Sequence, residues 1–79
     1  MTNVERIWLP GNSNNIRALI FFSEFCWCGQ CLEIDIAAQG DARELAIDNL
    51  ILTVECELDG GYEIGPAPEK FFKIWDGGE

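Results

Sequence analysis

The sequence predicts an α+β domain in which a small antiparallel sheet of three or four strands carries one main helix packed across it and a short C-terminal helix. Three observations support this class. Apolar, extended segments come early in the chain, one long stretch with helical periodicity follows them, and a proline-rich, aromatic segment comes last. A chain of 79 residues forms one small domain that buries roughly 60 to 65% of its unfolded surface.

The main helix is the element that the sequence predicts most directly. Asp41 and Glu44 have the spacing of a capping box, in which side-chain oxygens accept hydrogen bonds from backbone N–H groups of the first turn. Apolar residues then recur on one face of a helix with 3.6 residues per turn, and we expect them to face the core: Ile47, Leu50, Ile51, Val54 and Leu58. Residues 59–61, Asp-Gly-Gly, are expected to end the helix, since glycine readily takes the left-handed conformation found at many helix C-termini.

The segments before this helix have the composition of strands. Residues 4–9 alternate in polarity and predict a short strand, which a cluster of turn-forming residues ends at residues 10–15. Residues 16–25 are apolar at nearly every position, as is typical of a strand covered on both faces or lying at a subunit interface. Residues 27–37 are expected to pair with that strand as an antiparallel hairpin.

The chain after the main helix contains a second short helix. Residues 62–64 are expected to form a brief strand or extended chain, and the prolines that follow favour extended backbone. Pro68 is suited to the start of a helix over residues 69–75. Its aromatic residues are expected to pack as a lid on the domain or as an arm on another subunit. We therefore expect a single domain, 1–79, with an N-terminal strand and turn (1–15), a hairpin plus the main helix (16–60) and a proline-rich, aromatic tail (61–79).

A second apolar stripe lies on the opposite side of the main helix. Leu45, Leu52 and Cys56 project about 140 to 180° away from Ile47, at roughly 100° per residue. Either the C-terminal tail or another chain is expected to cover this stripe, because exposed apolar patches commonly mark interaction sites.

The charge of the chain favours a basic partner. Five basic residues stand against fourteen acidic ones, for a net charge of −9, which argues against nucleic acid or an anionic membrane as the ligand. Nine of the acids lie between residues 33 and 63, against Arg43 alone. They form either a solvated surface that maintains solubility or an electronegative face that steers a basic protein into place. The residues expected to bind a partner are Glu33, Asp35, Leu45, Asp48, Leu52, Glu55 and Cys56.

The residue types needed for several kinds of catalytic site are absent. The sequence contains no histidine, which excludes a self-contained Ser-His or Cys-His nucleophile pair. Neither a paired-carboxylate cleft nor a glycine-rich phosphate loop is indicated. We therefore expect no enzyme and no cofactor. Because no apolar run approaches about 18 residues and no secretory signal is present, a cytoplasmic location is expected.

Four cysteines match the ligand count of a structural zinc site: Cys26, Cys28, Cys31 and Cys56. Alternate residues of a strand point to opposite faces, so Cys26 and Cys28 would share a face while Cys31 would diverge from them. Reduced structural thiols and no bound metal are therefore expected, with zinc and a disulfide as alternatives.

The string WCGQCLEIDIAAQGDARELAIDNL, residues 27–50, resembles the central signature of HicB-like proteins. The string IGPAPEKFFKIW, residues 64–75, is similar to the proline-rich, aromatic tail of the same group. The matching positions are Gln30, Cys31, Leu32, Glu33, Asp35, Ile36, Gln39, Gly40, Pro66, Pro68, Phe71 and Trp75. The resemblance implies a partial ferredoxin-like fold, an antiparallel sheet with one helix packed across it.

The same resemblance implies a function in binding rather than catalysis. HicB-type antitoxins bind and mask a small basic ribonuclease toxin, so the resemblance implies an antitoxin-type inhibitor or an orphan relative. A homodimer is expected from the apolar segments, formed either through the strand at residues 16–25 or through the stripe of Leu45, Leu52 and Cys56. The partner would be a toxin ribonuclease or a nucleic-acid-binding effector. Only about twenty residues follow the main helix, so we expect the family's C-terminal DNA-binding segment to be missing. The alternatives are a phage-borne, anti-CRISPR-like inhibitor whose acidic surface mimics nucleic acid, and a metal- or redox-responsive protein that uses the cysteines.

Overall fold

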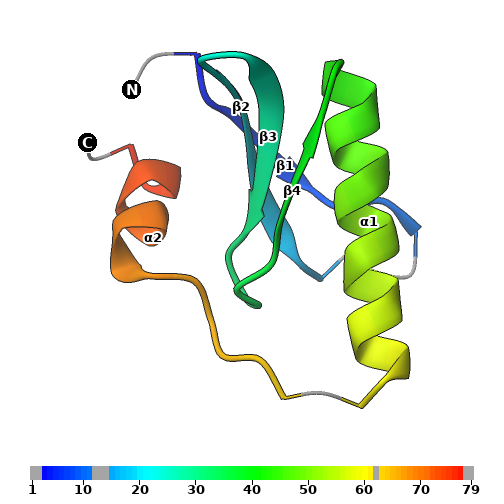
Figure 1. Cartoon of the computed structure of the whole chain (residues 1–79). Helices are drawn as coiled ribbons and strands as arrows, with labels where there is room; N and C mark the ends of the chain where they lie inside the picture. Colours follow the sequence, from blue (N-terminus) through cyan, green and yellow to red (C-terminus); the bar gives the residue numbers. More distant parts are fainter. Residues whose placement is uncertain (1–2, 12–14, 62, 78–79) are drawn as a thin grey trace.

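A four-stranded antiparallel sheet lies between two helices in the computed structural model, which describes residues 3–11, 15–61 and 63–77. The strands are adjacent in chain order, and α1 covers one face of the sheet while α2 lies against the other (Figure 1). This confirms the predicted α+β class, with its antiparallel sheet, main helix and short C-terminal helix. The elements are β1 (Glu5–Trp8), β2 (Arg17–Ser23), β3 (Cys26–Cys31), β4 (Ala37–Gly40), α1 (Arg43–Asp59) and α2 (Glu69–Trp75).

The segment expected to be one strand over residues 27–37 forms two strands instead. β3 ends at Cys31, the chain turns back through residues 32–36, and β4 then pairs antiparallel with β3. The turn is closed by the hydrogen bond from Cys31 N to Ile36 O, 2.9 Å, and its isoleucines at 34 and 36 are buried in the core. Because this turn is built from apolar and acidic residues rather than glycine or asparagine, its sequence resembles a continuing strand. β4 is thus the fourth strand, whereas Glu63 and Ile64 form none and Tyr62 lies outside the described residues.

β2 is an interior strand whose first half is covered on both faces. It pairs with β1 on one side and β3 on the other. The predicted covering of both faces is found only at residues 18–20, whereas Phe22 and Phe25 are 57% and 91% exposed. Ala18 and Ile20 face α1, whereas Leu19 faces the opposite side, and all three are at most 1% exposed. The buried core between the sheet and α1 consists of Leu9, Ile16, Ala18, Ile20, Cys31, Ile34, Ile36, Leu50 and Val54.

Two glycines let α1 approach the sheet closely. A Cβ atom on Gly29 would lie 3.0 Å from Leu50 Cδ2, and one on Gly40 would lie 2.6 Å from the backbone nitrogen of Ala46. The missing side chains therefore leave space that the helix fills, and they fix which of its residues face inward.

This close approach rotates α1 from the orientation that the sequence predicts. The buried residues are Ala46, Leu50 and Val54, while Ile47 and Ile51 lie at the edge of the core. Leu58 was predicted to face the core, but it is 53% exposed. Ala46 is not part of the predicted apolar stripe, yet it is fully buried, because its small side chain suits the close approach of the first turn of α1 to Gly40.

The predicted capping box is not formed. The N-cap residue is Ala42, no side chain caps the helix, and Glu44 accepts a hydrogen bond from Arg43 Nη1 at 2.9 Å instead. The C-terminus follows the prediction more closely: α1 ends at Asp59, and Gly61 takes a φ of 71°, the left-handed region that glycine occupies without a steric penalty.

α2 packs on the sheet face opposite α1 through aromatic and cationic groups. Trp75 contacts Trp8 edge-to-face, with ring centroids 6.2 Å apart. The guanidinium group of Arg17 lies 5.3 Å from the Trp75 ring, and Arg6 donates hydrogen bonds to the carbonyl oxygens of Ile74 and Trp75 at 2.8 and 2.9 Å. Because these carbonyl groups end the helix, the Arg6 charge also complements the negative end of the helix dipole. The tail is therefore a lid on β1 and β2.

Candidate functional site

The outer face of α1, defined by Leu45, Asp48, Leu52, Glu55 and Cys56, points away from the sheet, and all five residues are exposed. Leu45 and Leu52 are 49% and 60% exposed, which is high for leucine. The prediction that the C-terminal tail covers this stripe is wrong, because α2 lies across the opposite face of the sheet (Figure 1). No other part of the described chain covers this stripe.

Two parallel ridges run along this outer face. One contains Leu45, Leu52 and Cys56, with Asn49 between them, at the i, i+4, i+7, i+11 spacing of a single helix side. The other consists of the acidic residues Glu44, Asp48, Glu55 and Asp59. At 1.5 Å of rise per residue, the acidic ridge is about 22 Å long. An apolar strip and an acidic strip of several turns therefore lie side by side on one helix.

The acidic ridge has little positive charge near it. Within the described residues, ion pairs join Arg17 to Glu33, and Arg43 to both Glu5 and Glu44. None of these pairs involves Asp48, Glu55 or Asp59, and the sequence contains no basic residue between positions 43 and 70. The negative potential of this face is consequently not neutralised by the described part of the chain.

Glu33 and Asp35 do not belong to this face. Both lie in the turn between β3 and β4. Glu33 accepts hydrogen bonds from the backbone nitrogen of Arg17 at 2.7 Å and from its Nε at 2.6 Å. Asp35 accepts one from Gln30 Nε2 at 3.0 Å, and its backbone N–H donates to Gly65 O at 2.8 Å. The structure therefore divides the seven predicted residues into five on α1 and two that hold a turn and the tail in place.

The interactions of Glu33 predict a pH dependence of stability. Burial raises the pKa of Glu33, but the hydrogen bonds from Arg17 outweigh it, so that the pKa is lowered overall. A carboxylate with a lowered pKa in the folded state stabilises the fold above its unfolded pKa, and this contribution is lost as the pH falls through the folded value. We expect Glu33→Gln to destabilise the protein near neutral pH and the difference from wild type to shrink as the pH falls below the usual pKa of glutamate.

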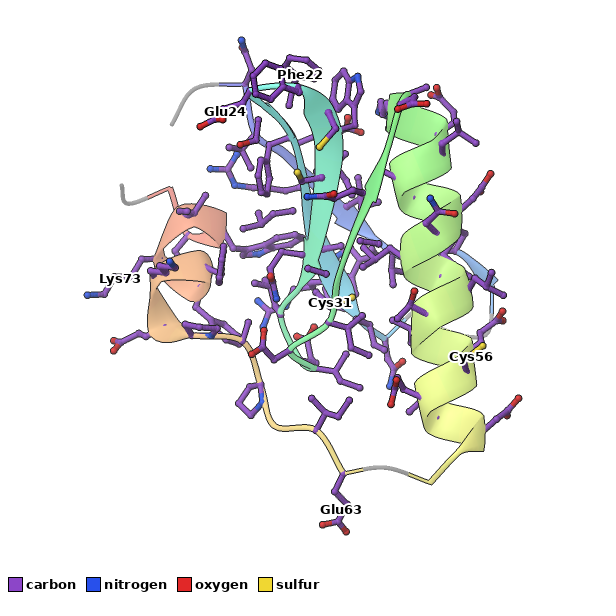
Figure 2. All side chains as sticks on the ribbon, in the orientation of Figure 1. Phe22, Glu24, Cys31, Cys56, Glu63 and Lys73 are labelled. Atoms are coloured by element: carbon purple, nitrogen blue, oxygen red, sulfur yellow. The ribbon has the colours of Figure 1, made fainter. Side chains whose placement is uncertain are left out.

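Urea unfolding curves at several pH values would measure this difference. Glu63→Gln is the matched control, because Glu63 is exposed and projects into solvent from the tail (Figure 2). A Glu33→Gln difference that stays constant with pH would contradict the role assigned to the Arg17 pair.

Sequence reasoning missed an aromatic group at the tip of the β2–β3 hairpin. Phe25 is 91% exposed and Phe22 57% exposed, and the Phe22 ring lies 5.7 Å from that of Trp27. Trp27 is opposite Gly40 in the sheet, and a Cβ atom on Gly40 would lie 2.8 Å from the backbone carbon of Leu45, so this tip lies near the N-terminal end of the outer face. The sequence signal is a phenylalanine, Phe25, within the two-residue turn, where polar residues are usual.

No protein-family model matches the chain, and neither a curated protein nor a solved structure is significantly similar to it. Among the described residues, no helix is long and apolar enough to cross a membrane. A functional conclusion about this chain must therefore be drawn from the geometry and charge of its surface.

Proposed function

We propose that this protein is a non-enzymatic, acidic binding module that masks a basic protein partner with the outer face of α1. It would act as an antitoxin-type inhibitor or as an orphan relative of HicB-like proteins. The observation that carries the proposal is the pair of parallel ridges, one apolar and one acidic, which no other part of the described chain covers.

Each ridge would make a different contribution to binding. Burial of Leu45 and Leu52 would contribute affinity, since apolar surface removed from water stabilises a complex by about 25 cal/mol per Å² before the entropy costs of association. The carboxylates of Asp48 and Glu55 would supply specificity and a faster association rate with a positively charged partner.

A protein partner fits this face better than nucleic-acid mimicry does. A mimic of a phosphate backbone needs regularly spaced negative charge, but it does not need exposed leucines beside that charge. Here Leu45 and Leu52 lie next to the carboxylates along the same helix, and apolar residues with these spacings are typical of helix docking on a protein. Competition by DNA or RNA for the bound partner is the result that would favour an anti-defence inhibitor instead.

A homodimer formed through the outer face would respond to salt in the opposite way to a complex with a basic partner. Two copies that met through this face would bring their acidic ridges together, and like charges across an interface oppose association. Raising the salt concentration screens that repulsion and would strengthen such a dimer, whereas it would weaken capture of a basic partner. Sedimentation at low and high salt separates these two uses of the face.

Affinity capture from cells of the source organism, followed by mass-spectrometric identification and purification of the captured protein, tests the proposal. We expect a basic partner whose binding is at least about tenfold weaker to Asp48→Lys/Glu55→Lys, because the reversed charges would repel it. Glu63→Lys/Glu69→Lys is the control, since it makes the same change in net charge at exposed positions in the tail and at the start of α2. Equal weakening by both double variants would show that overall charge, and not the outer face, drives binding.

A further inference from the structure

Two cysteines lie together on the sheet face opposite α1 and play no part in the proposed docking function. Cys26 and Cys28 are alternate residues of β3, so both side chains point to the same face. Their Sγ atoms are 3.8 Å apart, and both residues are half-buried. The other two cysteines are elsewhere: Cys31 lies in the core between the sheet and α1, and Cys56 lies on α1 (Figure 2).

The sheet holds this pair at a fixed spacing. Cys26 is opposite Ser23 of β2, and Cys28 is opposite Phe21 of β2 on one side and Gln39 of β4 on the other. Because β3 is hydrogen-bonded to both neighbouring strands, the two Cα atoms cannot approach each other without breaking the ladder. Alternate residues of an extended strand are about 6.6 Å apart along it, near the upper limit of about 6.8 Å for Cα atoms joined by a disulfide.

The separation of the sulfurs, which allows a thiol–thiol hydrogen bond, also suits two ligands on one metal ion. A disulfide requires the sulfurs to approach to about 2.05 Å. An ion held at about 2.3 Å from each sulfur, the usual zinc–thiolate bond length, would subtend an S–M–S angle of about 110° across a 3.8 Å gap, which is the tetrahedral value. The pair therefore has the geometry of half of a tetrahedral site, without movement of the strand.

We propose that Cys26 and Cys28 form a bidentate site for a thiophilic divalent cation of the zinc class. On binding, both S–H bonds break, two sulfur–metal bonds form and two protons leave to solvent, so no oxidant or reductant is needed. The net charge of −9 favours the approach of a cation. The zinc site of four cysteines that the sequence offers as an alternative is not assembled, because Cys31 lies in the core and Cys56 on α1; the proposed site uses one pair only.

The remaining two coordination positions must be filled from outside this pair. Within the described residues, no group of three or more histidine, cysteine, aspartate or glutamate side chains is gathered to hold a metal ion. Water, or the same cysteine pair of a second copy, can supply the other ligands. The two sources predict different stoichiometries: one ion per chain with water, and one ion per two chains with a second pair.

Titration of the reduced protein with Cd²⁺ tests the site, because cadmium thiolates have a charge-transfer absorption in the ultraviolet that the free ion and the protonated thiols lack. We expect a charge-transfer band that saturates at one ion per one or two chains, with the chain mass measured by light scattering distinguishing these cases. Cys26→Ser and Cys28→Ser should each remove most of the band, and Cys56→Ser should retain it.

Protection from alkylation provides a second measurement that needs no variant. Bound Cd²⁺ should slow the reaction of Cys26 and Cys28 with iodoacetamide by at least about tenfold while leaving Cys56 reactive, as read by peptide mass spectrometry. The proposal is overturned if the wild type develops no band, if the band survives both single substitutions, or if cadmium protects neither cysteine of the pair. These outcomes leave the docking function of α1 untouched, because the two sites lie on opposite sides of the sheet.

Discussion

Val54→Asp is expected to unfold the domain. Val54 is fully buried between α1 and the sheet, in the same core cluster as Leu50 and Ile20. A carboxyl group at this position would lose its hydration without gaining a hydrogen-bonding partner, which costs several kcal/mol. A domain of this length has a free energy of unfolding of about 4 to 12 kcal/mol, so one such change would remove most or all of that stability. Far-ultraviolet circular dichroism and thermal melting would show the loss of cooperative unfolding.

Leu52→Asp is the matched control for this result. It introduces the same side chain two residues earlier in the same helix, but at a position that is 60% exposed. The cost there is limited to helix propensity and surface charge, less than about 1 kcal/mol. If Val54→Asp melted cooperatively with near wild-type stability, or if Leu52→Asp were equally damaging, the orientation of α1 described above would be incorrect.

Gly40→Ala is expected to destabilise the protein by about 1 to 3 kcal/mol. The added Cβ would lie 2.6 Å from the Ala46 backbone nitrogen and 2.8 Å from the Leu45 backbone carbon. Because these are backbone atoms at the start of α1, no side-chain rotation can relieve the contact, and the first turn of the helix must move away from β4. Gly40 does not have a positive φ, so the loss would report packing and not backbone strain. Urea unfolding at equilibrium gives the difference in free energy.

Gly65→Ala is the control for that substitution. A Cβ atom on Gly65 would meet nothing within 4 Å, and its φ is not positive either. We expect a gain in stability of about 0.4 to 1 kcal/mol, because alanine restricts the unfolded chain more than glycine does. If Gly40→Ala and Gly65→Ala lowered the free energy of unfolding by similar amounts, the loss at residue 40 would not come from the contact between β4 and α1.

Much of the fold follows from local patterns in the sequence. The apolar period of residues 47–54 is sufficient to predict α1, since no other regular structure places those residues on one side. The glycines after Asp59 predict its end, and Pro68 predicts the start of α2, because proline fixes φ and lacks the N–H group that a helix interior requires.

The candidate site was predictable only in part. The opposite stripe of Leu45, Leu52 and Cys56 is visible in the sequence because it depends on helix periodicity alone. Whether the tail covers that stripe depends on contacts between distant segments, and the contacts of Trp75 with Trp8 and Arg17 place the tail on the far side of the sheet. Glu33 and Asp35 were grouped with the helix residues by their charge, but hydrogen bonds between distant parts of the chain assign them to a turn.

The sequence by itself therefore determined the class of the fold, the extent of both helices and the acidic character of the surface, because each depends on residues near one another in the chain. The tertiary structure alone decided which side of α1 faces inward, where the apolar run breaks into β3 and β4, and which carboxylates remain available to a partner. The physical reason is that these features depend on contacts between distant segments, such as Gly40 with Ala46 and Arg17 with Glu33. Such contacts leave no periodic signal in the chain.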